Sequence, residues 1–212
     1  MRAVDAPDPV RVTGSRLLPV LPLEDSCLFP GASLALVLDR PAAVSSALLA
    51  ARCGGRLLAL ARRENGASAR DLHTIGTIAT VREIQSLSPL EHRAELDGVT
   101  RARVDLLVGT EVLVAEAVPI EEGDEADEWG PAVEALARYL HAHADLRAFL
   151  EKQRRSTEAM SWVNLACQHL PITGSARQKL LASNPPERCL RTSRGPDALP
   201  RNGPVAAASP PA

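Results

Sequence analysis

The hydrophobic pattern of the 212-residue chain changes once, at an acidic run over residues 121–128. No other feature of the sequence limits the possible folds as much as this change. Before the run, apolar residues come in short stretches that end at glycine or proline, as strands do. After it, Val133, Leu136, Ala137 and Leu140 follow the i, i+3, i+4, i+7 spacing of one helix face. The sequence therefore predicts an α+β protein in which a strand-rich part precedes a helical part.

The strand-rich part is expected to form a small β-barrel. We expect strands at 16–23, 33–38, 56–62, 75–87, 91–96, 102–107 and 112–119, with turns at Asp97-Gly98 and Gly109-Thr110. One helix should be inserted after the second strand, because Pro41 suits a first helical turn and Gly54-Gly55 ends the apolar stripe. Pro19 and Pro22 lack a backbone N–H, so residues 16–23 are expected to form an edge strand or an irregular extended segment rather than a central strand. This number of short strands indicates a closed or nearly closed β-domain.

These patterns divide the chain into five parts. Residues 1–14 are expected to be a loose leader, 15–120 the barrel, 121–128 an acidic linker, 129–193 a helical bundle, and 194–212 a disordered tail rich in Pro, Ala, Gly and Ser. Within the bundle, Phe149 belongs to a second helix and Trp162 to a third, and Thr173 opens a fourth.

Composition excludes several classes of function. Of the 24 basic residues only Lys152 and Lys179 are lysine, and neither follows the glycine of a G-x-x-x-x-G-K-[ST] phosphate loop, so P-loop ATP hydrolysis is excluded. The net charge of −2 and five scattered aromatic residues do not favour nucleic acid. No G-x-S-x-G, H-E-x-x-H or G-x-G-x-x-G motif is present. The residues therefore predict a non-catalytic protein without a cofactor.

Cysteine and histidine spacing gives no metal site. The four cysteines, Cys27, Cys53, Cys167 and Cys189, never form a C-x-x-C pair, so we expect reduced thiols, with Cys27 and Cys167 as small core residues. His141 and His143 are two residues apart and point to different faces of a helix. His73 and His92 lie near expected strands and are expected to be satisfied or exposed rather than catalytic. Without a signal peptide or a membrane span, a cytoplasmic protein is expected.

Several motifs, in order, resemble the N-terminal substrate-binding domain of the ATP-dependent Lon protease. They are Leu18-Pro19-Val20-Leu21-Pro22-Leu23, Leu28-Phe29-Pro30-Gly31, the stretch from Leu34 to Arg40, the stretch from Leu72 to Ala79, Asp97-Gly98-Val99-Thr100-Arg101, and Leu170-Pro171-Ile172. The resemblance covers about residues 16–192. It implies a PUA-like β-barrel followed by a helical bundle, and a role in recognising protein substrates. It looks like a stand-alone version of the domain, so ATPase and peptidase activity are not carried over.

The resemblance and the missing chemistry together predict a non-catalytic module that binds exposed apolar polypeptide segments, as an adaptor or regulator of proteolysis. Leu34 and Leu36, with Arg40 at the rim, are the candidate contacts, either in an apolar groove or by strand addition at the first strand. A separate protease is a candidate partner. Phe29 and Trp162 are expected in the core. The alternative is an RNA-binding PUA-like protein.

Overall fold

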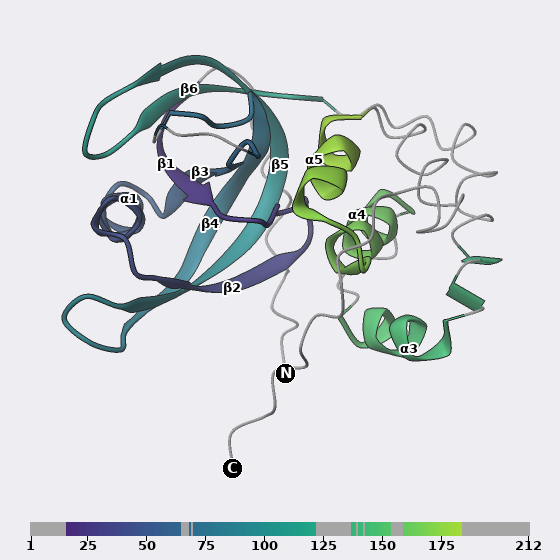
Figure 1. Ribbon diagram of the computed structural model, residues 1–212. Coiled ribbons are helices and arrows are strands. Elements are labelled where there is room, and N and C mark those ends of the chain that lie inside the picture. Colours follow the sequence, from purple (N-terminus) through teal and green to yellow (C-terminus); the bar gives the residue numbers. More distant parts are fainter. Residues whose placement is uncertain are drawn as a thin grey trace, which may run out of the picture.

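A computed structural model describes residues 16–64, 68, 70–121, 137–138, 140–141, 143–153 and 159–183 (Figure 1). The elements are β1 (Arg16–Leu23), β2 (Ser33–Leu38), α1 (Pro41–Arg52), β3 (Arg56–Ala61), β4 (Ile75–Ser86), β5 (His92–Val108), β6 (Val114–Pro119), α3 (Ala144–Gln153), α4 (Ala159–His169) and α5 (Gly174–Ala182). The predicted α+β class is confirmed. The expected leader, the tail and most of the acidic run lie outside the described residues, and the division into five parts stays a prediction.

The six strands form one curved sheet in the order β2-β5-β4-β3-β1-β6, and β5 also pairs with β6. The length of β5 permits the curvature, because its first part pairs with β2 and its last part with β6. Of the predicted closed or nearly closed β-domain, full closure is wrong: among the described strands β2 pairs with β5 alone, which leaves the sheet a free edge. The PUA-like description of this sheet stays a prediction.

β1 lies between β3 and β6 rather than at an edge, so that prediction is also wrong. Arg16–Pro19 pair antiparallel with β6, whereas Val20–Leu23 pair parallel with β3. Each half of β1 therefore pairs along one side, and the missing N–H of Pro19 or Pro22 can face the other side. This arrangement also removes β1 as a free edge for strand addition.

The Asp97-Gly98 pair lies within β5 rather than in a turn between two strands. The Gly98 N–H donates to the Ala32 carbonyl (2.9 Å), and the Gly98 carbonyl accepts from the Gly31 N–H (2.9 Å). A Cβ on Gly98 would lie 2.2 Å from the Phe29 carbonyl oxygen. Glycine is therefore required here for the close approach of another backbone segment, and not for chain reversal.

That segment is the Leu28-Phe29-Pro30-Gly31 motif, and the predicted turn within it is confirmed. The Ala32 N–H donates to the Phe29 carbonyl (3.2 Å), and Gly31 has a φ of +75°. Phe29 is completely buried, as predicted, and the Thr77 hydroxyl on β4 donates to the Leu28 carbonyl. The motif is thus part of the core.

The core lies on both faces of the curved sheet. Leu57 and Ala59 of β3 belong to one cluster and Leu58 and Leu60 to the other, as the twofold alternation of a strand requires. The larger cluster joins the sheet to α1, α4 and α5. Trp162 packs against it while half-buried, so its predicted core position is confirmed in part.

Buried polar side chains join the C-terminal helices to the sheet and to the segment that precedes β2. Gln168 of α4 accepts from the Phe29 N–H (2.9 Å) and donates to the Cys27 carbonyl (3.0 Å). Gln178 of α5 donates to the Ile75 carbonyl (2.9 Å). Such bonds satisfy backbone groups that would otherwise be buried without partners.

Arg101 of β5 makes a second connection to α5. The Arg101 side chain is almost completely buried, and its Nη1 donates to the Leu181 carbonyl (3.0 Å) and the Ser183 carbonyl (2.8 Å). A cation at the C-terminal end of a helix is favoured by the helix dipole. At the other end of α5, Thr173 accepts from the Ala176 N–H (3.1 Å), which confirms the predicted opening of this helix. Whether α3, α4 and α5 form a separate bundle stays a prediction.

We expect Gln168→Leu to lower the free energy of unfolding by about 3 kcal/mol, because it leaves the Phe29 N–H and the Cys27 carbonyl buried without partners. Denaturant titration followed by circular dichroism measures the change. Gln85→Leu, the same substitution at an exposed position of β4, is the control and should change stability by less than about 0.5 kcal/mol. Equal effects of the two variants would contradict the prediction.

Candidate functional site

An apolar hollow lies where β1, β2 and α1 meet, with a volume of about 180 Å³. Its lining residues are Val20, Pro22, Leu23, Glu24, Ser26, Leu36, Val37, Leu38, Asp39, Arg40, Ala42, Ala43, Ser46, Arg62, Thr110, Glu111 and Leu113. The strands and the helix supply mainly aliphatic side chains, and the charged residues come from the segments that follow them. Apolar cavities of about 150 Å³ bind benzene. The hollow therefore has room for one apolar side chain.

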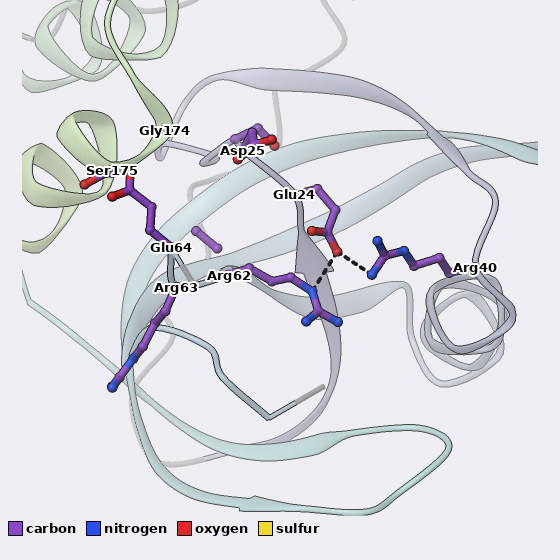
Figure 2. A pocket seen from close by; sticks show the side chains of 10 residues that line it. Glu24, Asp25, Arg40, Arg62, Arg63, Glu64, Gly174 and Ser175 are labelled. Carbon is purple, nitrogen blue, oxygen red and sulfur yellow. Dashed lines mark ion pairs between the residues drawn. The ribbon is translucent and has the colours of Figure 1, made fainter. Parts of the chain in front are cut away.

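A second, polar hollow of about 370 Å³ lies beside the first (Figure 2). Its lining residues are Glu24, Asp25, Ser26, Arg40, Ala61, Arg62, Arg63, Glu64, Gly174 and Ser175. Four of these residues, Glu24, Ser26, Arg40 and Arg62, also line the apolar hollow. The two hollows are therefore neighbouring parts of one depression.

An ion-pair cluster of Glu24, Arg40 and Arg62 lies where the two hollows meet. Glu24 Oε1 is 2.8 Å from Arg40 Nη1 and 2.6 Å from Arg62 Nε, so one carboxylate oxygen serves two guanidinium groups (Figure 2). The side chains of Glu24 and Arg40 are about half exposed (48% and 56%), whereas that of Arg62 is 20% exposed. Arg62 is thus the fixed member of the cluster.

The strand topology brings these three residues together. β1 and β3 are parallel neighbours with Leu23 opposite Ala61, so Glu24 and Arg62 follow the C-terminal ends of two adjacent strands. Arg40 is the residue before α1, and its backbone is extended.

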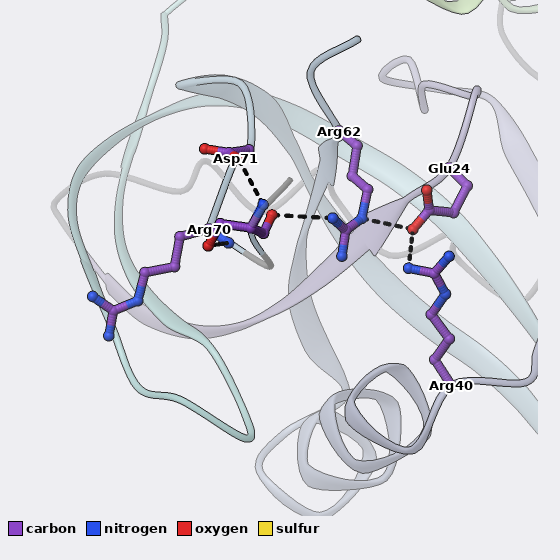
Figure 3. Close-up of polar contacts among 6 residues, drawn as sticks. Glu24, Arg40, Arg62, Arg70 and Asp71 are labelled. Carbon is purple, nitrogen blue, oxygen red and sulfur yellow. Dashed lines mark hydrogen bonds and ion pairs between the residues drawn. The ribbon is translucent and has the colours of Figure 1, made fainter. Parts of the chain in front are cut away.

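Hydrogen bonds around Arg62 fix the segment that follows β3 (Figure 3). Arg62 Nη1 donates to the Ser68 carbonyl (3.1 Å), and the Ser68 N–H donates to Asp71 Oδ2 (2.7 Å). Arg70 Nη2 donates to the Gly109 carbonyl (2.7 Å) at the end of β5. Arg62 therefore has a partner on each side, which holds its guanidinium at the edge of both hollows.

The structure brings together two of the three predicted contact residues. Leu36 and Arg40 both line the apolar hollow. Leu34 is half-buried and packs against the larger core cluster, and it is not among the residues that line the hollow. Glu24 and Arg62 escaped the sequence analysis, because their proximity depends on the parallel pairing of β1 with β3.

None of the cysteines and histidines that the structure describes is among the residues that line the two hollows. Cys27 and Cys167 are buried, as predicted, Cys53 is exposed, and Cys189 is outside the described residues. Burial raises the pKa of the Cys27 thiol to about 12. A thiol that stays protonated at neutral pH is a poor nucleophile.

The four histidines considered above are dispersed. The pKa of His73 is lowered mainly by burial and to a smaller extent by the positive charge of the neighbouring Arg63. His92 is half-buried on β5, and His141 and His143 are exposed. In the described part of the chain, no three His, Cys, Asp or Glu side chains gather in a metal-binding arrangement. Among the helices that the structure describes, none has the length and apolar character needed to span a bilayer.

Comparison with known proteins identifies the family. Residues 17–192 match the model of the ATP-dependent protease La (LON) substrate-binding domain, so the chain belongs to that family. The predicted resemblance to the Lon substrate-binding domain is confirmed.

The relatives found among curated proteins are Lon proteases. The chain is 31% identical over 127 residues to the Lon protease of Xanthomonas oryzae pv. oryzae, which covers 58% of this chain and 15% of that protein. It is 23% identical over 176 residues to the Lon protease of Parabacteroides distasonis, covering 77% and 21%. The chain therefore spans about a fifth or less of the length of these two relatives.

Two solved structures share the fold. The N-terminal domain of the Mycobacterium avium complex Lon protease superposes with a TM-score of 0.69 at 21% identity, covering 86% of this chain and 97% of that chain. The Lon N-terminal domain protein from Xanthomonas campestris gives a TM-score of 0.58 at 20% identity, covering 84% and 96%. The curved sheet with its C-terminal helices is thus a Lon N-terminal domain fold.

We expect iodoacetamide at pH 8 to alkylate Cys53 and to leave Cys27 unmodified in the folded protein, because the Cys27 thiol is buried and protonated. Peptide mapping by mass spectrometry reads each cysteine separately. Labelling in denaturant is the control, in which both thiols should react. Rapid labelling of Cys27 in the folded protein would contradict the buried position.

Proposed function

We propose that this chain binds exposed apolar segments of polypeptides, and that it acts through this binding as an adaptor or regulator of proteolysis. The observation that carries the proposal is the apolar hollow beside β2 on a fold of the LON substrate-binding family. A concave apolar surface with a few polar groups at its rim is the usual form of a recognition site.

The position of the hollow at the edge of the sheet favours an extended ligand. β2 contributes Leu36, Val37 and Leu38 to the lining, and its outer side has no neighbour among the described strands. An extended segment could therefore pair with β2 while one of its side chains enters the hollow. Strand addition is proposed here at β2, since β1 is enclosed by β3 and β6.

The RNA-binding alternative has no support from the family match or from the surface described here. The polar hollow carries three arginines and three acidic residues, so it offers no excess of positive charge along a phosphate backbone. Among the residues that the structure describes, no aromatic side chain lines either hollow to stack with a base.

A separate protease is the proposed recipient of captured segments, with the cytoplasm as the proposed location. The three described cysteines are free, as is usual in a reducing compartment.

We expect Leu36→Asp and Val37→Asp to weaken binding of a fluorescent unfolded polypeptide by about tenfold, because a charge in the hollow opposes entry of an apolar side chain. Fluorescence anisotropy at physiological salt measures the dissociation constant. Val37 is 56% exposed, so its replacement tests the hollow even if Leu36→Asp impairs folding. Leu90→Asp is the matched control, since Leu90 is an exposed leucine outside the hollow. Unchanged binding by folded Val37→Asp would reject this site.

A further inference from the structure

We infer that the preferred ligand is an extended segment in which an apolar side chain, seated in the apolar hollow, is accompanied by an acidic side chain that binds Arg40 and Arg62 in place of Glu24. This inference rests on the proposed function, because it specifies the class of segment that the same depression accepts. It follows from the way the two hollows share their charged residues.

The cluster at the junction has more positive than negative charge. Among the described residues, the ion pairs of Arg40 and Arg62 are both with the same oxygen, Glu24 Oε1. Each guanidinium has five N–H donors in a planar fork that matches a carboxylate. The single Glu24 oxygen therefore accepts from few of the N–H donors that Arg40 and Arg62 present.

The other charged residues of the polar hollow, Arg63, Asp25 and Glu64, balance the cluster in number, but none of them has a described ion pair with Arg40 or Arg62. Figure 2 shows the Glu64 side chain extending toward Ser175, while Arg63 extends away from the cluster. A ligand carboxylate at the junction would thus contact the two arginines rather than these acidic residues.

The charges on the apolar side orient the ligand. Asp39 and Glu111 are among the residues that line the apolar hollow. They disfavour an acidic side chain in that hollow, whereas Arg40 and Arg62 favour one at the junction. The arrangement selects both the chemistry of the segment and the order of its two side chains along the depression.

Glu24 is suited to give way to a ligand. Its side chain is 48% exposed and that of Arg40 is 56% exposed, and exposed ion pairs contribute little to stability, so releasing Glu24 from Arg40 costs little. Arg62 stays in place during the exchange, because its Nη1 is bonded to the Ser68 carbonyl. Glu24 thus occupies the position of the ligand carboxylate when the site is empty.

An internal acidic residue fits this position better than a C-terminal carboxylate. The polar hollow continues past the two arginines as far as Gly174 and Ser175 at the start of α5. A bound segment can therefore run from the apolar hollow across the junction and onward, without ending at the arginines.

The test uses three fluorescent 12-residue peptides that share one apolar sequence. The first has a glutamate directly before an internal leucine, and the second has glutamine in place of that glutamate. The third also has glutamine before the leucine, but the peptide ends at this leucine with a free carboxylate. We expect the wild-type protein to bind the glutamate peptide about fivefold more tightly than the glutamine peptide. The preference should disappear in about 1 M salt, where charges are screened beyond roughly 3 Å.

Substitutions at the cluster provide the second arm. We expect Glu24→Gln to tighten binding of the glutamate peptide by about fivefold and leave the glutamine peptide unaffected, because the arginines lose their internal competitor. Arg40→Gln should remove the preference. Glu83→Gln and Arg93→Gln replace exposed residues outside both hollows and should change nothing.

The outcomes separate this inference from the proposed function. Equal binding of the glutamate and glutamine peptides by the wild-type protein would overturn the inference and leave apolar capture intact. Tightest binding of the peptide with the terminal carboxylate would overturn the internal position of the acid. Failure of all three peptides to bind would overturn the inference together with the proposed function.

Discussion

The rest of the structure depends on the way residues 27–32 are enclosed between the sheet and the C-terminal helices. Gly98 lets the Phe29 carbonyl approach β5, and Gln168 bonds the Phe29 N–H and the Cys27 carbonyl from the helix side. A buried backbone segment without such partners would cost several kcal/mol. These contacts place the start of β2, and hence the hollow beside it, at a fixed distance from α4 and α5.

The same enclosure positions the charged cluster at the other end of this loop. Glu24 lies between the end of β1 and the buried segment, so its place is determined by the β1–β3 pairing on one side and by the core on the other. Arg62 is held by the Ser68 carbonyl, and Arg40 by the start of α1. The Glu24–Arg40 pair is about half exposed and contributes little to stability, and the cluster lies between the two hollows, which is the basis of the recognition role proposed above.

Membership of the LON substrate-binding family and the geometry of the depression support the same role from different directions. The family match concerns the whole of residues 17–192, whereas the hollows concern the junction of β1, β2 and α1. The fold neighbours show the architecture alone. The depression of this chain has aliphatic residues on one side and, on the other, two arginines that share one glutamate.

The sequence by itself determined most of the elements, because periodicity, proline, glycine and capping residues act within a few positions of one another. It predicted α1 from Pro41, the turn at Gly31 and the opening of α5 at Thr173. Only the tertiary structure decided that β1 is interior, that β5 is continuous through Gly98, and that the sheet keeps β2 as an edge. It also decided the cluster of Glu24, Arg40 and Arg62, because parallel strand pairing joins residues far apart in sequence and leaves no local pattern to detect.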